Sequence, residues 1–220
     1  MTELASHRPQ RRIGTSRRAL TGRVAVGGSQ AVDFESSLER DWLEQLDFDP
    51  RVVELQVQPF SLEHEVEGRQ RRYTPDVLAV WQHGSARETV VYEVKFRDDL
   101  RDNWVDYRPR FVAASRYCRE RGWRFKIMTE RRIRTPMLSA VKFLRPYRRI
   151  EDHAVFRERL VAGLRDMGPT TVAQLLEATF DSKQERLQAL PSLWKLVANF
   201  DVEVDFGKPL SMRTQVRSTT

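Results

Sequence analysis

The stretch YTPDVLAVWQHGSARETVVYEVKF, residues 73–96, decides the fold. It holds two runs of β-branched and aromatic residues separated by the turn-forming segment QHGS, which predicts a β-hairpin turning about Ser85. In such a hairpin Asp76 faces Val94, or Glu93 if the register slips by one residue. Two acids are therefore expected near one another at one end of a sheet.

The second arm of this hairpin carries a glutamate and a lysine two residues apart. Strand alternation puts Val91, Glu93 and Lys95 on one face. A solvent-facing salt bridge is the common explanation for such a triplet, but the chain contains 32 Arg and only 6 Lys, and Lys95 is the only lysine before Lys126. Because a compact ammonium can position or activate a water, or stabilise a pentacovalent phosphate, this scarcity favours a chemical role for Lys95.

A helix from Phe34 to Asp47 is predicted before the hairpin, with Asp33 as its N-cap. A helical projection places Glu39 between Leu46 and Leu43 on the apolar half of the helix. A carboxylate in that position is costly unless it is paired or binds a metal. With this helix start Glu39 lies beyond the first turn, in which the helix dipole favours acids, so a functional role is favoured over a buried salt bridge.

The acids Glu39, Asp76 and Glu93 together predict a cation site. Oxygen ligands with open water positions suit Mg²⁺, with Mn²⁺ as the alternative, and two such ions about 4 Å apart could activate water and stabilise the leaving oxygen of a phosphodiester. The four histidines show no metal-ligand spacing, and Gly-rich phosphate-loop motifs are absent. Zinc chemistry and nucleotide hydrolysis are therefore not expected.

The wider pattern predicts an α/β domain with a mixed sheet. Extended segments beginning at Arg51, Phe60, Tyr73 and Thr89 suggest a mainly antiparallel meander. A helix opened by Pro109 and ending near the glycine at 122 follows, and then the strand WRFKIMT and a helix around MLSAVKFL. The expected domains are a basic flexible arm over 1–30, the α/β domain over 31–150, and a winged-helix-like domain of three helices and a terminal hairpin over 151–220.

The formal charge of +7 and the pI near 9.9 indicate an anionic partner, which for a basic protein is usually nucleic acid. Residues 1–150 carry 29 Lys+Arg against 21 Asp+Glu, whereas residues 151–220 carry 9 against 10. We therefore expect the last domain to contact protein rather than DNA. The arm is either a solvated tail or a contact to DNA phosphates through Arg11, Arg12, Arg17 and Arg18.

The single cysteine, Cys118, excludes a disulfide within the chain and favours a reducing compartment. No apolar run has the length of a signal peptide or of a membrane span. We expect a cytoplasmic, DNA-associated protein without membrane contact.

P-D at 75 and 76 followed by E-x-K at 93 to 95 resembles the PD-(D/E)xK nuclease signature of restriction-endonuclease-like folds. More narrowly, residues 34–130, through FESSLERDWL, VQPF, TPDVLAV and VYEVKF, resemble the N-terminal catalytic domain of TnsA, the transposon-end endonuclease of prokaryotic TnsABC-type transposons. The resemblance implies a restriction-endonuclease-like core with metal-binding acids, a catalytic lysine and a supporting glutamine: Glu39, Asp76 and Glu93, then Lys95, then Gln58.

The resemblance also implies partners. The chain would cut the 5′ ends of the element in double-stranded DNA while a TnsB-like transposase cuts the 3′ ends, and its C-terminal domain would engage a TnsC-like ATPase regulator. Two alternatives stay open: a stand-alone PD-(D/E)xK restriction or repair nuclease, and a non-catalytic DNA-binding assembly protein.

Overall fold

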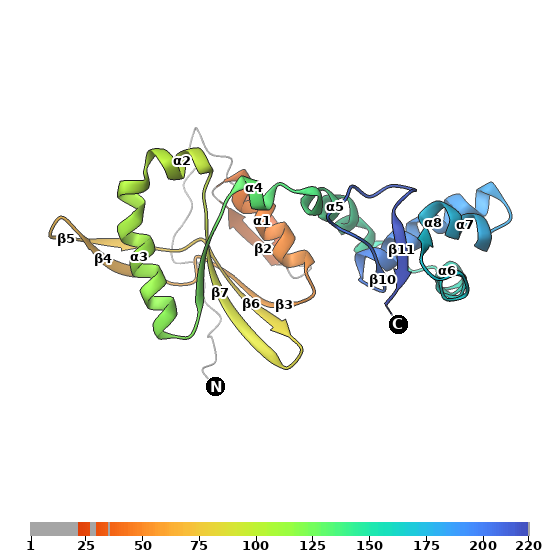
Figure 1. The fold of residues 1–220 in the computed structure, drawn as a ribbon, viewed down its shortest axis with the longest axis horizontal. Helices are drawn as coiled ribbons and strands as arrows, with labels where there is room; N and C mark the ends of the chain where they lie inside the picture. Colours follow the sequence, from red (N-terminus) through yellow and green to blue (C-terminus); the bar gives the residue numbers. More distant parts are fainter. Residues whose placement is uncertain (1–21, 27–29, 35, 220) are drawn as a thin grey trace. The chain divides into compact units, whose positions relative to one another are not determined.

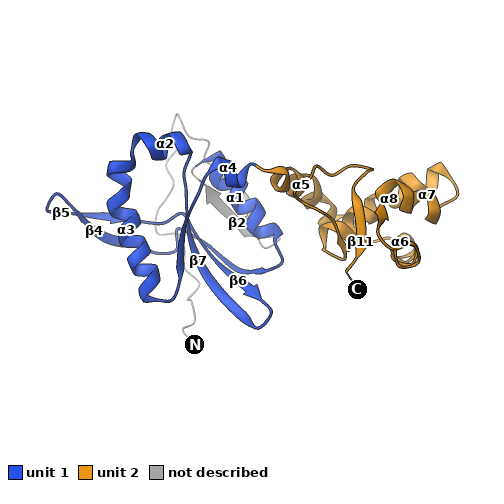
Figure 2. Ribbon diagram, viewed as in Figure 1, with its two compact units in different colours: residues 1–134 blue, residues 135–220 orange. Residues whose placement is uncertain are grey.

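The computed structural model describes residues 22–26, 30–34 and 36–219 of the chain. They form two compact units, residues 1–134 and residues 135–220, coloured blue and orange in Figure 2. Within these described ranges no helix is both long and apolar enough to cross a membrane. The predicted DNA contacts of the arm, Arg11, Arg12, Arg17 and Arg18, lie outside the described residues.

A four-stranded mixed sheet forms the centre of the first unit (Figure 1). Its order is β3-β6-β7-β8; β6 pairs antiparallel with β3 and with β7, whereas β7 and β8 are parallel. A parallel pair needs a long crossover, which here contains two helices. The predicted mixed sheet of an α/β domain is therefore confirmed. The strands are β3 (Val52–Val57), β6 (Val77–His83), β7 (Ala86–Val94) and β8 (Arg124–Met128).

Strands β6 and β7 form the predicted hairpin. Residues 84 and 85 make a two-residue turn. The φ of +60° at Gly84 is the left-handed value that the first position of such a turn favours. The register pairs Val77 with Tyr92, so Asp76 lies level with Glu93. The sequence allowed two registers, with Asp76 facing either Val94 or Glu93, and the structure has the second.

Helices α1 (Ser37–Phe48) and α3 (Trp104–Glu120) cover opposite faces of the sheet (Figure 1). Each fully buried aliphatic side chain in these layers contributes about 1.5–3 kcal/mol. Alternation along β7 is confirmed, because successive residues enter different clusters: Val90, Tyr92 and Val94 pack with α1, and Val91 packs with Cys118 of α3.

The first helix begins later than predicted. The sequence predicted a start at Phe34 with Asp33 as the cap, but Phe34 ends a strand and the cap is Ser36, whose hydroxyl accepts a 3.1 Å hydrogen bond from the N–H of Glu39. A serine in extended conformation satisfies a free N–H of the first turn, and hydrophobic spacing alone does not detect this. The shift places Glu39 in the first turn of α1.

The predicted meander is wrong in its second segment. Strand β4 (Leu62–Val66) does not join the central sheet but pairs with β5 (Arg69–Tyr73) in a separate hairpin. Glu67 and Gly68 have φ of +51° and +71°, the left-handed values that a tight hairpin turn favours. Strand β5 reads RQRRY, and its polar side chains gave no strand signal. Tyr73 consequently belongs to this hairpin and not to the strand that follows Asp76.

Helix α3 begins at Trp104 rather than at Pro109, which lies inside it. A proline removes one backbone hydrogen bond, and here the helix accommodates that loss. The predicted end is confirmed, since Gly122 follows α3 with φ of +69°. The other elements of the unit are β1 (Gly22–Val26) paired with β2 (Gln30–Phe34), and the short helices α2 (Arg97–Asp102) and α4 (Glu130–Ile133).

The second unit combines helices with a small antiparallel sheet of order β10-β11-β9. The three predicted helices after residue 151 and the terminal strand pair are present, whereas the two-residue strand β9 was not predicted. The elements of the second unit are α5 (Pro136–Leu144), the 3₁₀ helix η1 (Arg145–Arg149), α6 (Ala154–Met167), β9 (Thr170–Thr171), α7 (Val172–Thr179), α8 (Lys183–Ala198), β10 (Val202–Glu203) and β11 (Gln215–Ser218).

The units divide after Arg134, whereas the sequence placed a boundary after residue 150. Helix α5 and η1 pack on α8 of the second unit: the ring of Phe143 lies 5.2 Å from that of Trp194, and Nε of Arg148 donates a 2.8 Å hydrogen bond to the carbonyl of Ala198. The composition changes only after RPYRR, so composition alone grouped α5 with the preceding domain.

Candidate active site

Asp76 lies immediately before β6 and is held from two sides. Its Oδ2 accepts a 2.7 Å hydrogen bond from the N–H of Val94, and its carbonyl accepts a 2.8 Å bond from the N–H of Gln58. Gln58 follows β3 directly and has a left-handed φ of +49°. Its supporting role stays a prediction, and its backbone contact places it beside Asp76.

Glu93 is a carboxylate inside the unit, with 2% of its surface exposed. Its Oε2 accepts a 2.5 Å hydrogen bond from the hydroxyl of Tyr73, while Oε1 lies 3.1 Å from Nζ of Lys95 and 3.6 Å from Nη2 of Arg110. Burial, reinforced by the neighbouring Asp76, raises the pKa of Glu93 to about 7. Desolvation therefore outweighs the nearby cations, and the carboxyl titrates close to neutral pH.

Lys95 lies between the two carboxylates. Its Nζ is 3.1 Å from Oε1 of Glu93 and 3.5 Å from Oδ2 of Asp76, and it donates a 3.1 Å hydrogen bond to the carbonyl of Val94. Its backbone N–H bonds to the carbonyl of Met128 in β8 at 3.0 Å. Two strands thus fix the lysine at the ends of β7 and β8.

The electrostatics of this cluster keep Lys95 charged. Burial lowers the pKa of Lys95, but Asp76, Glu93 and Glu39 together raise it well above its usual value. Of the two roles considered from the sequence, activation of a water and stabilisation of charge on phosphate, this environment favours the second.

Glu39 lies at the margin of the cluster. Its Oε1 accepts a 3.1 Å hydrogen bond from the hydroxyl of Ser36, and its charge helps to raise the pKa of Lys95. Because it lies in the first turn of α1, the cap contact and the helix dipole also explain an acid there. The sequence argument placed Glu39 beyond the first turn because it assumed an earlier helix start. Since Glu39 lies in the first turn, its position no longer favours a functional role.

Two side chains of the site were not predicted. Tyr73 reaches Glu93 from the β4–β5 hairpin, and Arg110 reaches it from α3, with its guanidinium 4.0 Å from the ring centre of Tyr107 and 5.4 Å from that of Tyr73. An aromatic residue closing a polar run was a weak signal for Tyr73. Arg110 had no signal, because it is one arginine among 32.

The oxygen atoms around Lys95 are of the kind that divalent metal ions bind. Oδ2 of Asp76, Oε1 of Glu93 and the carbonyl of Val94 all lie within 3.5 Å of one ammonium nitrogen, so a cation already occupies an all-oxygen environment. Hard oxygen ligands of this kind suit Mg²⁺. In the part of the chain that the structure describes, no group of three or more His, Cys, Asp or Glu side chains is placed to hold a metal ion. The structure therefore brings Asp76, Glu93 and Lys95 into contact, and the role of Glu39 as a third acid stays a prediction.

Comparisons with known proteins agree with this geometry. A family model described as "TnsA-like endonuclease N terminal" matches residues 49–130, and one described as "TnsA endonuclease C terminal" matches residues 132–206. The first match contains Asp76, Glu93 and Lys95 but begins after α1, so Glu39 lies outside it. A comparison with curated proteins found no significant match.

Proposed function

Because the chain belongs to the TnsA-like endonuclease family, we propose that it is the metal-dependent subunit of a heteromeric TnsABC-type transposase that cuts the 5′ ends of the transposon. The observation that carries this proposal is the convergence of Asp76, Glu93 and Lys95 at the ends of β6 and β7. Two acids at one sheet end can hold a metal ion that activates water, and a lysine beside them can stabilise charge on the phosphate, so the set is suited to hydrolysis of a phosphodiester.

Asp76 and Glu93 are the residues that would hold the metal ion, Mg²⁺ or Mn²⁺, with Glu39 as the proposed third acid and two ions as the proposed number. When bound, such an ion polarises the phosphodiester and makes water a better nucleophile. The chain's own contribution is to fix the acids: the Val94 N–H orients Asp76, and the Tyr73 hydroxyl orients Glu93.

Lys95 is proposed as the catalytic lysine. A raised pKa keeps its ammonium protonated, so it is suited to neutralise the negative charge that develops on a pentacovalent phosphate. Its backbone is tied to Met128 and its side chain to Glu93. Its anchored backbone keeps the ammonium beside the acids that would hold the metal ion, and its flexible side chain can turn from their oxygens toward a phosphate.

For the second unit we propose a winged-helix-like domain that engages a TnsC-like ATPase. The supporting observation is the order α6-β9-α7-α8-β10-β11, in which β9 and β10 both pair with β11. The charge argument is weaker than the sequence suggested, because residues 135–220 carry 13 Lys+Arg against 10 Asp+Glu. The proposed protein partner therefore rests mainly on the family.

Reconstitution tests the proposal. DNA carrying both transposon ends is incubated with this chain, a TnsB-like transposase, a TnsC-like ATPase and Mg²⁺, and cuts on each labelled strand are mapped. We expect 5′ cuts to require this chain and Mg²⁺, and to disappear in Asp76→Ala while 3′ cuts persist. Cleavage by the chain without partners would favour a stand-alone nuclease. 5′ cleavage that requires the chain but persists in Asp76→Ala would favour a non-catalytic assembly role.

A further inference from the structure

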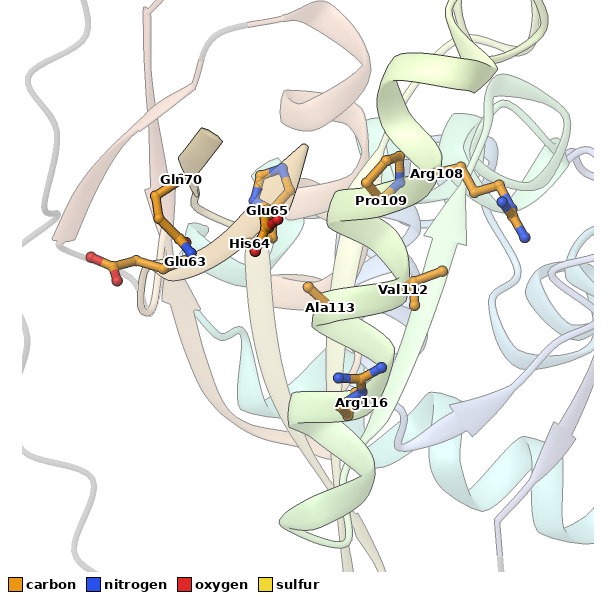
Figure 3. A pocket seen from close by; sticks show the side chains of 9 residues that line it. All are labelled: Glu63, His64, Glu65, Gln70, Arg108, Pro109, Val112, Ala113 and Arg116. Carbon is orange, nitrogen blue, oxygen red and sulfur yellow. The ribbon is translucent and has the colours of Figure 1, made fainter. Parts of the chain in front are cut away.

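Two pockets of the first unit differ in the charge of the side chains that line them. One, of about 540 Å³, lies between the β4–β5 hairpin and α3 (Figure 3). Arg108 and Arg116 line it together with Glu63 and Glu65, and Figure 3 shows Glu63 directed away from α3. Burial, followed by the charges of two nearby arginines, lowers the pKa of the His64 ring in its wall. With equal numbers of cations and acids, this pocket has no preference for a polyanion.

The second pocket has a different lining. It has a volume of about 320 Å³ and lies where β7 leads into α2 and β8 leads into α4. Three exposed arginines, one half-buried leucine and one threonine form its walls, and no acid does. We call it the arginine groove, and its lining residues are Arg97, Leu100, Thr129, Arg131 and Arg132.

Among the residues that the structure describes, the three guanidinium groups of the arginine groove have no bonding partner. In residues 36–219 none of the three forms an ion pair, whereas Arg51, Arg124 and Arg134 pair with acids. Unpaired guanidinium groups gathered around one hollow repel each other, so a ligand that brings negative charge relieves this repulsion.

The acids nearest in sequence to the groove already have other donors. Glu130 accepts a 3.0 Å bond from the backbone N–H of Arg97, and Asp98 pairs with Arg101 at 3.1 Å. Asp99 accepts a 2.8 Å bond from the hydroxyl of Tyr107. None of these three acids lines the groove or pairs with its guanidinium groups, so those groups remain open to an external partner.

The groove adjoins the proposed catalytic lysine. Arg97 follows Lys95 by two residues, so their Cα atoms are at most about 7 Å apart, and Thr129 follows Met128, whose carbonyl binds the N–H of Lys95 at 3.0 Å. Phosphates along one DNA strand rise about 3.4 Å each. A phosphate at the lysine thus places its next neighbours within reach of the groove.

We propose that the arginine groove binds the sugar–phosphate backbone of the DNA substrate next to the phosphate that is cut. This inference rests on the proposed function, since it assumes DNA at Lys95. The groove supplies contacts to phosphates and not to bases, so it positions the strand without reading its sequence. Arginine suits this task because its planar fork can bind a phosphate through two N–H groups.

The test compares two triple variants of the full chain in binding to a short labelled duplex, in EDTA, over a range of salt concentrations. R97A/R131A/R132A removes the three arginine side chains that line the groove. R87A/R119A/R121A is the matched control: it removes the same charge from exposed arginines at the opposite end of the sheet, near the β6–β7 turn and the end of α3. Circular dichroism establishes that each variant is folded.

We expect the groove variant to bind on the order of tenfold or more weakly at low salt, and the slope of log K against log salt to become shallower by about 2 to 3, equally on transposon-end and unrelated DNA. The control should change affinity by about twofold or less. Equal losses in both variants, no loss in the groove variant, or no measurable binding by the parent chain would overturn the inference.

Cleavage in the reconstituted reaction separates this inference from the proposed function. If the parent chain binds DNA through the groove but never cuts it, the proposed function fails and the groove stands. If the parent chain and the groove variant both cut, with the same dependence on DNA concentration, the proposal that the groove binds DNA fails and the proposed function stands.

Discussion

The hydroxyl of Tyr73 donates a 2.5 Å hydrogen bond to Oε2 of Glu93, and this bond joins the β4–β5 hairpin to the central sheet. It engages one oxygen of the carboxylate and leaves the other to Lys95 and Arg110. A polar hairpin outside the sheet therefore determines how the buried acid of the site is oriented.

Replacing this tyrosine should weaken metal binding without removing the fold. Tyr73→Phe keeps the ring in its cluster but leaves Oε2 of Glu93 without its donor. Partners that orient a metal ligand are typically worth 10–100-fold in affinity or activity. We expect the Mg²⁺ concentration for half-maximal cleavage, and the Kd for Mn²⁺ by calorimetry, to rise by roughly tenfold or more. Tyr117→Phe, on the neighbouring helix face, should change neither value.

Glu93→Gln should stabilise the metal-free chain at high pH. The pKa of Glu93 is raised from 4.5 to about 7, chiefly by burial. Between these values the folded state keeps a proton that the unfolded state has lost, so the stability that this carboxyl contributes is complete below pH 4.5 and is lost as pH rises through 7. Glutamine imitates the protonated acid at every pH.

Thermal unfolding in EDTA measures this effect. We expect Glu93→Gln to have a higher Tm than the parent chain at pH 8, with a free energy of unfolding larger by up to about 3 kcal/mol. At pH 5 the two Tm values should be nearly equal. Glu88→Gln on the same strand is the control, because a hydrogen bond from Arg124 lowers the pKa of Glu88 and its charge is favoured. A lower Tm for Glu93→Gln at pH 8 would contradict burial as the dominant cause.

Lys95→Arg should lose cleavage although it keeps the positive charge. A guanidinium is larger and planar and cannot take the place of the compact ammonium between Glu93 and Asp76. We expect strand cleavage to slow on the order of a hundredfold or more, as in Lys95→Ala, with the fold retained. Lys126→Arg, in β8 of the same sheet, should cut normally. Normal cleavage by Lys95→Arg would mean that any fixed cation suffices.

Truncation should distinguish the two domain boundaries. Removing residues 135–220 deletes a whole compact unit, whereas removing 151–220 leaves α5 without α8, on which it packs. The exposed apolar side chains would then be Leu138, Val141 and Leu144, all buried in the full chain. We expect the chain ending at 134 to elute as a monomer and the chain ending at 150 to self-associate in size-exclusion chromatography. The opposite ranking would favour the boundary at 150.

The β6–β7 hairpin could be predicted from the sequence because its information is local. Alternation, a glycine-containing turn and a proline at the strand entrance all lie within residues 73–96, and the faces of Glu93 and Val94 follow from them. The one-residue choice of register needed the turn geometry, which places the left-handed φ at Gly84.

The contacts of Glu93 could not be predicted in the same way. Arg110 comes from a helix after the sheet strand, and Tyr73 from a hairpin strand whose other residues are polar. Neither side chain is marked by spacing or composition, because each reaches the acid only through tertiary packing. For Glu39 the difference was local: the helix begins three residues later than predicted, with Ser36 as its cap, and Glu39 therefore lies in the first turn.

Strand β7 has one partner close in the chain and one far away. The β6–β7 hairpin can form once residue 94 has emerged from the ribosome, but Lys95 receives its backbone anchor only when Met128, on the other side of the α2–α3 crossover, has emerged as well. Pairing across such a separation is slow compared with closing a hairpin. A partly translated chain therefore carries the acids and the lysine on an open strand edge, and acquires an ordered site only after the crossover closes.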